Sequence, residues 1–211
     1  MPLFRDGDSL LHDCGERPEQ RALLAWAEEV GLESPPDWHR LVLERWLWDH
    51  RERLDGKRVL DVGVDFRRDY FGPGYVTFGQ YDEDVTGDLH ELPFATGSLD
   101  AVCMTEVLEH VERPQRAVDE VRRALKPGGV LLVTSPFVWP WHGIPGVYRD
   151  FWRFTHEGWA YLLRDFAKVA ITRVPWTNEG ATFWDMVRRF EGMGWKRDVD
   201  AATGYLAEAI A

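Results

Sequence analysis

The chain has 211 residues, and its 25 lysines and arginines against 36 aspartates and glutamates give a formal net charge of −11. A hydrophobic fraction of 45% is enough for a globular core, and it excludes a disordered or collagen-like chain. The acidic balance argues against nucleic acid and against anionic membrane surfaces as partners, because both need a basic face. Two cysteines are too few for a disulfide framework.

The N-terminal part of the chain is expected to be a helical cap. Apolar residues at helical spacing predict helices over residues 19–30 and 38–54, with Asp37 as the N-cap of the second. We find no apolar stretch typical of a signal peptide or a transmembrane helix, so we expect a cytoplasmic protein. One domain is predicted, comprising a cap (1–56), a cofactor-binding half (57–138) and a substrate-side half (139–211).

From residue 58 onward, short apolar strands alternate with helices. This alternation predicts an α/β, Rossmann-like fold, a mostly parallel sheet with helices on both faces that binds ligands at the carboxyl ends of its strands. No clear strand follows Ile171, where we expect only a helical stretch at 182–191 and an alanine-rich tail, so a seventh strand stays in doubt. The expected strands are 58–64, 75–78, 99–104, 130–134 and 169–172, and the expected helices are 113–125 and 156–166, the latter capped by Thr155.

Four segments at predicted strand ends carry polar or glycine-rich motifs. Gly63 ends the first strand and lets the backbone approach a ligand without a Cβ. Asp88 can accept a hydrogen bond from an exocyclic amine such as that of adenine, and Leu89 offers an apolar face beside it. The four segments are 61–63 (Asp-Val-Gly), 87–94 (Gly-Asp-Leu-His-Glu-Leu-Pro-Phe), 105–111 (Thr-Glu-Val-Leu-Glu-His-Val) and 125–129 (Leu-Lys-Pro-Gly-Gly).

In this order and spacing, the motifs resemble those of class I S-adenosylmethionine-dependent methyltransferases of the small type 11 family, over residues 58–166. The resemblance implies S-adenosylmethionine as the cofactor and assigns its site by matching positions. The acid that would bind the ribose is displaced from its usual place, and Asp82 is the best candidate. The other matched residues are Asp61, Val62 and Gly63 at the methionine end, Asp88 and Leu89 at the adenine, and Thr105 and Glu106 beside the sulfonium.

The loop after Gly63 departs from the family pattern. Asp65 and Arg67 stand where the family prefers glycine, and their bulk leaves less room for the carboxylate of the cofactor. Arg67 or Arg68 can instead pair with that carboxylate. The departure motivates one alternative, a catalytically degenerate methyltransferase-fold protein that acts as a binding or regulatory partner.

His110 and His142 are the candidate general bases, because a neutral imidazole suits deprotonation of a hydroxyl near pH 7. A structural or solvent-exposed role is an equal alternative for each. Glu106, Glu109 and His110 share one turn, and with His142 they can bind a divalent cation. We expect no metal and favour a role at the edge of the cofactor site, with simple exposure as a third interpretation.

The long aromatic segment 137–154 resembles the substrate-covering segment of the family. We expect it to form a pocket wall in which Trp141, Tyr148 and Trp152 contact the substrate and Arg153 orients a polar group. The alternative is that these aromatic side chains only bury the segment. All 11 tryptophans lie outside residues 49–138, so the predicted cofactor half has none.

The sequence therefore predicts methyl transfer from S-adenosylmethionine to a small aromatic or apolar acceptor, at oxygen rather than nitrogen. The partner is a small molecule, and a homodimer is an open alternative. A nicotinamide-dependent oxidoreductase is disfavoured because no Gly-x-Gly-x-x-Gly follows the first strand. An RNA methyltransferase is opposed by the net charge and the lack of a basic stripe.

Overall fold

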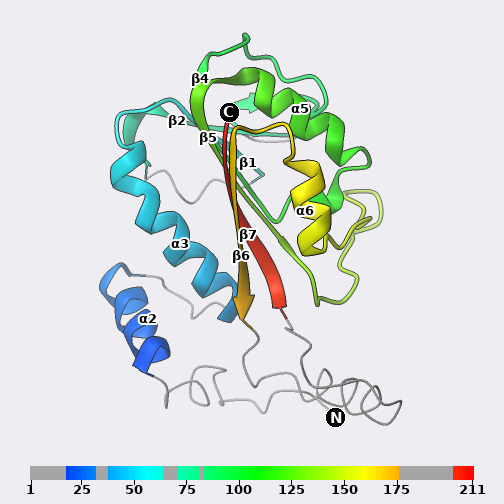
Figure 1. Cartoon of the computed structure of the whole chain (residues 1–211). Coiled ribbons are helices and arrows are strands. Elements are labelled where there is room, and N and C mark those ends of the chain that lie inside the picture. The colour runs from blue at the N-terminus through cyan, green and yellow to red at the C-terminus, as the bar shows by residue number, and fades with distance from the viewer. Residues whose placement is uncertain (1–17, 32–37, 64–70, 81–82, 176–201) are drawn as a thin grey trace. The chain divides into compact units, whose positions relative to one another are not determined.

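The computed structural model describes residues 18–31, 38–63, 71–80, 83–175 and 202–211 (Figure 1). Several sequence-based predictions lie outside these ranges: the Asp37 cap, the bulky loop with Asp65, Arg67 and Arg68, the candidate Asp82 and the helical stretch 182–191. The chain divides into two compact units, Met1–Arg45 with Val174–Ala202 and Trp46–Arg173 with Thr203–Ala211. This division does not test the predicted three-part organisation, which concerns function.

The first unit contains the two predicted helices of the N-terminal region. Helix α2 spans Pro18–Glu29, and helix α3 spans Trp38–Leu54 and continues into the second unit. Trp26 is buried, and the guanidinium of Arg45 lies over its ring at 5.2 Å from the centroid. Both helices are therefore confirmed, to within a residue at each end.

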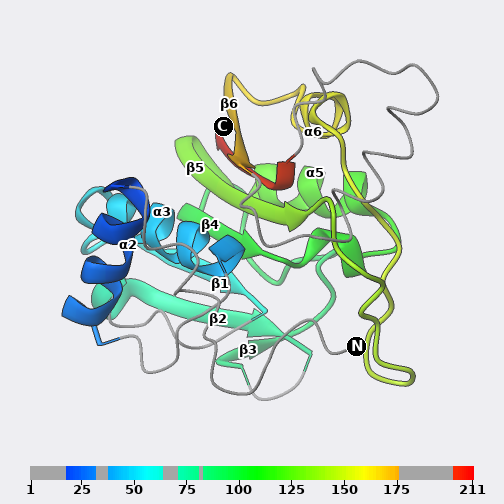
Figure 2. The same ribbon diagram turned by 90° about the horizontal axis from the view of Figure 1, so that it is seen from below.

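The second unit is built on a seven-stranded sheet of order β3-β2-β1-β4-β5-β7-β6, which Figure 2 shows strand by strand. Strand β1 pairs in parallel with both β2 and β4, and β4 pairs in parallel with β5. The order of the strands reverses between β1 and β4, and such a switch point is where open α/β sheets bind ligands. The strands are β1 (Val59–Val62), β2 (Tyr75–Gly79), β3 (Val85–Thr86), β4 (Leu99–Thr105), β5 (Leu125–Pro136), β6 (Lys168–Pro175) and β7 (Ala202–Ile210).

Strand β7 corrects the sequence analysis, which found no clear seventh strand. It pairs antiparallel with β5 from Val130↔Ile210 to Pro136↔Gly204. Alanine has a low propensity for strands, so the local sequence gives little indication of one. The strand forms because it pairs with β5. Ala207 and Ala209 are completely buried there.

Two further helices lie together on one side of the sheet in Figure 1, α5 (Pro114–Ala124) and α6 (His156–Leu162). Helix α5 buries one stripe of small and branched side chains, namely Ala117, Val118, Val121 and Ala124. The predicted cap is confirmed, because the Thr155 hydroxyl accepts a hydrogen bond from the Gly158 amide at 3.1 Å. Helix α6 ends at Leu162, four residues before the predicted end at Phe166.

The part of α3 in the second unit contributes to the same core. Leu47 and Leu54 are buried, and Arg53 and His50 both pair with Glu208 of β7. Two short 3-10 turns complete the described structure, η1 (Gly72–Gly74) before β2 and η2 (Leu108–His110) after β4. None of the helices in the described ranges has the length and apolar character to cross a membrane.

Candidate functional site

A cavity of about 750 Å³ lies where β1, β2 and β4 end, at the switch point of the sheet. Its walls come from these three strand ends, from the loop after β3, from η2 and from the segment after β5. Its lining residues are Val62, Gly63, Phe78, Gly79, Gln80, Glu83, Gly87, Asp88, Leu89, His90, Glu106, Val107, His110, Val111, Glu112, Arg113, Val147, Tyr148, Arg149 and Phe151.

Gly63 forms the floor at the end of β1. Its φ of 103° lies in the region that favours glycine, and its amide donates to the Phe78 carbonyl at 3.0 Å. A Cβ at this position would come within 3.1 Å of Cγ2 of Val107. Only glycine meets both conditions without strain, so the backbone here is open to the cavity.

Asp61, two residues earlier, does not line the cavity. Its side chain is completely buried and accepts a hydrogen bond from the Tyr75 hydroxyl at 2.6 Å. The three residues of the predicted motif therefore have different surroundings. Val62 and Gly63 line the cavity, whereas Asp61 is buried and hydrogen-bonded to Tyr75 of β2.

Asp88 and Leu89 line the cavity as predicted. Oδ1 of Asp88 accepts hydrogen bonds from the amide of His90 at 2.8 Å and from Nδ1 of His90 at 2.7 Å. The amide of His90 is the main reason that the pKa of Asp88 lies below its usual value, so the group is ionised at neutral pH. Leu89 is buried and supplies an apolar surface next to this charge.

Glu83 is a cavity residue that the sequence analysis missed. It follows the described end of β2, and its carboxylate lies so close to Gly79 that a Cβ there would be 2.3 Å from it. Position 79 therefore requires glycine, because the Glu83 side chain occupies the space that a Cβ would take. The signal in the sequence is an acid soon after the second strand; the predicted Asp82 is its neighbour and lies outside the described residues.

Glu106 stands at the end of β4, opposite Gly63. Its φ is positive, at 56°, and no other non-glycine residue in the described ranges has a positive φ. Its Oε1 accepts a hydrogen bond from the hydroxyl of Thr134 at 2.7 Å, and its amide donates to Oγ1 of Thr134 at 3.2 Å. Backbone strain of this kind is concentrated at functional sites. Thr105 is buried and is not among the lining residues.

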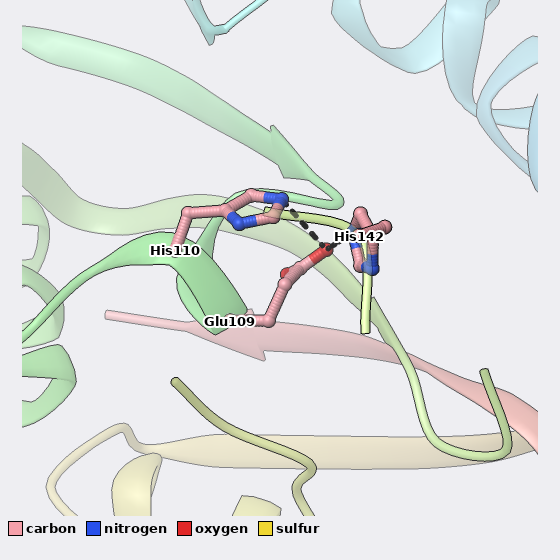
Figure 3. A group of neighbouring side chains, drawn as sticks. All are labelled: Glu109, His110 and His142. Carbon is pink, nitrogen blue, oxygen red and sulfur yellow. Dashed lines mark ion pairs between the residues drawn. The ribbon is translucent and has the colours of Figure 1, made fainter. Parts of the chain in front are cut away.

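His110 and His142 lie side by side, although they are far apart in the sequence, and Glu109 points between them (Figure 3). Their ring centroids are 4.8 Å apart, and His110 lines the cavity. Burial and then the nearby Glu106 raise the pKa of Glu109 to about 9. Burial also lowers the pKa of His110, which favours a neutral ring.

The aromatic segment 137–154 contributes only some of its predicted residues to the cavity. Tyr148 lines the wall, with its ring 4.6 Å from that of His110. Trp141 is 66% exposed and Trp152 is 42% exposed, and neither lines the cavity. These large side chains therefore do not serve to bury the segment, and their contact with a substrate stays a prediction.

Arg153 holds the segment together. It donates to Oδ1 and Oδ2 of Asp150 at 2.5 and 2.8 Å, and also to the carbonyls of Trp139 and Pro140. It does not line the cavity, so the predicted contact with a polar group of the substrate would require it to leave these partners.

Three comparisons place this geometry among known proteins. A family model for the methyltransferase domain, type 11, matches residues 68–133. A demethylmenaquinone methyltransferase from Renibacterium salmoninarum is 35% identical over 116 residues, which cover 46% of this chain and 47% of that protein. The chain thus spans about half the length of that relative.

Solved structures share the fold at low sequence identity. The putative methyltransferase of Haloferax volcanii, solved in complex with the Trm112 methyltransferase activator, is 21% identical with a TM-score of 0.54, covering 90% of this chain and 95% of that one. A SAM-dependent methyltransferase from Archaeoglobus fulgidus is 16% identical with a TM-score of 0.54, covering 83% and 100%. Residues 68–133 therefore match the type 11 methyltransferase domain, and the sheet has the Rossmann-like fold of these methyltransferase structures, as the motifs predict.

Proposed function

We propose that this protein transfers a methyl group from S-adenosylmethionine to a small-molecule acceptor, with both molecules bound in the cavity at the switch point. The observation that carries the proposal is the composition of this cavity. An open glycine backbone, an acid after β2 and an Asp-Leu pair meet at one strand edge. These are the groups that a charged amino acid, a ribose and an adenine require.

Each part of the cofactor has a matching group. Val62 and Gly63 accept the methionine end, where Gly63 presents backbone without a side chain to the cavity. Glu83 accepts two hydrogen bonds from the vicinal hydroxyls of the ribose, in the role that the sequence analysis gave to Asp82. Asp88 binds the amine of the adenine, and Leu89 packs on its ring.

The sulfonium then lies near Glu106. Its carboxylate is oriented by Thr134, and the charge of a sulfonium favours an acidic neighbour. Methyl transfer is a direct displacement, so alignment of the acceptor with the methyl group supplies much of the rate. The rigid strand end at Thr105 and Glu106 provides that alignment.

The acceptor binds on the side of η2 and of segment 137–154. Tyr148, Val147 and Phe151 line this side, which supports an aromatic or apolar molecule. The relative named for demethylmenaquinone supports the same class. Two imidazoles next to the cavity favour a hydroxyl acceptor, which must lose a proton, over an amine. His110 and His142 are either its general bases or the ligands considered below.

The test is calorimetric titration of the full chain with S-adenosylmethionine. We expect one binding site in the wild type and at least about tenfold weaker binding in Glu83→Gln, which loses a charge-assisted hydrogen-bond pair. Glu91→Gln is the matched control, because Glu91 is exposed on the loop after Asp88 and does not line the cavity. Equal loss in both variants would contradict the assignment of Glu83.

An assay with methyl-labelled S-adenosylmethionine, run beside the titration, distinguishes methyl transfer from the rival interpretation. A catalytically degenerate protein that still binds the cofactor would give the binding heat but no labelled product with any of a panel of phenols, quinols and amines. Absence of heat and of a thermal shift at millimolar cofactor would contradict the proposed function as a whole.

A further inference from the structure

Glu109, His110 and His142 form a cluster whose chemistry the methyl transfer does not explain. Glu109 and His110 come from η2, and His142 comes from the segment after β5 (Figure 3). Oε1 of Glu109 lies 3.6 Å from Nε2 of His110 and 3.9 Å from Nε2 of His142. One atom from each residue lies within 4.8 Å of the other two.

The hydrogen bonds on the far side of each ring determine where its proton lies. Nδ1 of His110 is 2.6 Å from the Arg149 carbonyl. A carbonyl only accepts, so this nitrogen carries the hydrogen, and Nε2 of the neutral ring has a free lone pair.

His142 has the same arrangement. Its Nδ1 lies 3.2 Å from the Pro140 carbonyl and 3.2 Å from Oδ2 of Asp150, and both of these oxygens accept. Arg153 also approaches this nitrogen, at 3.5 Å, but it donates to Asp150 at 2.8 Å, which is the shorter contact. Nδ1 of His142 therefore carries the hydrogen, and its Nε2 presents a lone pair.

Glu109 supplies the third acceptor. Its side chain has an exposed fraction of 0%, and neither carboxylate oxygen has a hydrogen-bond partner in the described part of the chain. Three lone pairs thus converge, and the described residues place no donor between them. A buried carboxylate in such surroundings is unfavourable unless a cation or a proton compensates it.

The distances distinguish a proton from a metal ion. A hydrogen bond from a protonated Glu109 to an imidazole would need an oxygen–nitrogen distance of about 2.5–3.0 Å. The observed 3.6 and 3.9 Å are longer. An ion held at about 2.0–2.2 Å by each ligand separates the ligand atoms by roughly 3–4 Å, and both Glu109–histidine distances lie in this range. The cluster as a whole spans 4.8 Å, so its side chains would draw slightly closer around the ion.

We propose that Glu109, His110 and His142 bind a divalent first-row transition-metal ion such as Zn²⁺. Two imidazoles and one carboxylate favour this class over Mg²⁺, which prefers oxygen ligands. The hydrogen bonds from each Nδ1 to a carbonyl or carboxylate are the outer contacts that orient metal-binding histidines. His110 also lines the cavity, so the ion borders it.

As ligands, the two imidazoles use the lone pairs that a general base would need. The metal site therefore excludes the role of His110 and His142 as bases. The preference for a hydroxyl acceptor would then rest on the bound ion, which lowers the pKa of an oxygen that it contacts. It does not depend on the proposed function, because its test needs neither cofactor nor acceptor.

The experiment uses the full chain without a polyhistidine tag, freed of metal with EDTA and dialysed. Titration with Co²⁺, followed by its visible absorption, and competition by Zn²⁺ measure the site. We expect one equivalent of Co²⁺ with absorption typical of mixed nitrogen and oxygen ligands, displaced by Zn²⁺. Glu109→Gln and His142→Gln are expected to bind roughly 100-fold more weakly, and His156→Gln, away from the cluster, as the wild type does.

Folding of the variants is checked by thermal denaturation in EDTA. We expect Glu109→Gln to be at least as stable as the wild type there, because neither oxygen of the Glu109 side chain has a hydrogen bond to lose in the described part of the chain, and to lose the stabilisation that Zn²⁺ gives the wild type. If Co²⁺ and Zn²⁺ do not bind the wild type, or bind Glu109→Gln and His142→Gln equally well, the proposal is wrong. If S-adenosylmethionine fails to bind while Co²⁺ binds as expected, the proposed function is wrong and the metal site stands.

Discussion

Arg123 binds Glu120 one turn away on α5 through two parallel contacts, Nε to Oε1 and Nη2 to Oε2, both at 2.9 Å. The same pair reaches the loop that follows Asp88 and Leu89. Arg123 donates to the carbonyls of Leu92 and Phe94, and Glu120 accepts from the Leu92 amide. The pair thus connects α5 to the loop that follows Asp88 and Leu89, two residues that line the cavity.

This relationship predicts a specific dependence of stability on pH. The hydrogen bonds from Arg123 hold the pKa of Glu120 below its usual 4.5 in the folded protein. The contribution is complete above the unfolded value and is lost as the pH falls through the lowered folded value. Because both side chains are partly exposed, we expect Glu120→Gln to lower the free energy of unfolding by less than about 1 kcal/mol at pH 6.

Urea denaturation at pH 6 and pH 3.5 provides the measurement. The difference between wild type and Glu120→Gln should shrink at the lower pH. A difference that grows on acidification would mean that Glu120 does not act through its ionised form. Asp119→Asn on the exposed face of the same helix is the control.

Gly63 and Gly97 form a matched pair of glycines with positive φ, 103° and 66°. A Cβ at Gly63 meets Val107, whereas one at Gly97 meets nothing within 4 Å. Both alanine variants should lose about 1 kcal/mol of stability from backbone strain. Only Gly63→Ala should also weaken cofactor binding, by about tenfold or more, measured by calorimetry. Equal affinities in the two variants would show that Gly63 does not adjoin the cofactor.

The hydrogen bond between Tyr75 and Asp61 is expected to stabilise the end of β1 next to the cavity. Tyr75→Phe removes the 2.6 Å hydrogen bond to a fully buried carboxylate, so we expect a loss of about 1.5–3 kcal/mol in the free energy of unfolding. Tyr161→Phe, whose side chain is 66% exposed, should change it by less than about 0.5 kcal/mol. Chemical denaturation of both variants measures the difference, and similar losses would contradict the role of Asp61.

The exposed tryptophans of segment 137–154 test the division between cofactor and acceptor sides. Trp141→Ala and Trp152→Phe should alter the KM for the acceptor severalfold, because segment 137–154 forms the proposed acceptor side. They should leave the affinity for S-adenosylmethionine within about twofold, because neither tryptophan lines the cavity. The loss of cofactor affinity without a change in acceptor use would contradict this division.

Much of the fold could be predicted because its signals are local. The apolar runs that end at Gly63 and Glu106 mark β1 and β4 without reference to the rest of the chain. Strand β7 could not be found in this way, because its alanines become a strand only against β5. The periodicity of a helix or strand can be read from neighbouring residues, whereas the pairing of β7 with β5 joins residues that are far apart in the sequence.

The site was predicted in part for the same reason. Val62, Gly63, Asp88, Leu89 and Glu106 follow strand ends and do line the cavity. The complete burial of Asp61 and of Glu109 depends on tertiary packing. The sequence could therefore not show that Asp61 accepts a hydrogen bond from Tyr75, or that the Glu109 carboxylate has no hydrogen-bond partner among the described residues.

The most direct measurement of the central claim is a crystal structure of the full chain with S-adenosylhomocysteine. We expect the adenine on Leu89 beside Asp88, the ribose hydroxyls on Glu83, and the sulfur between Gly63 and Glu106. Density for the ligand elsewhere, or an empty switch-point cavity in crystals grown at saturating ligand, would contradict it.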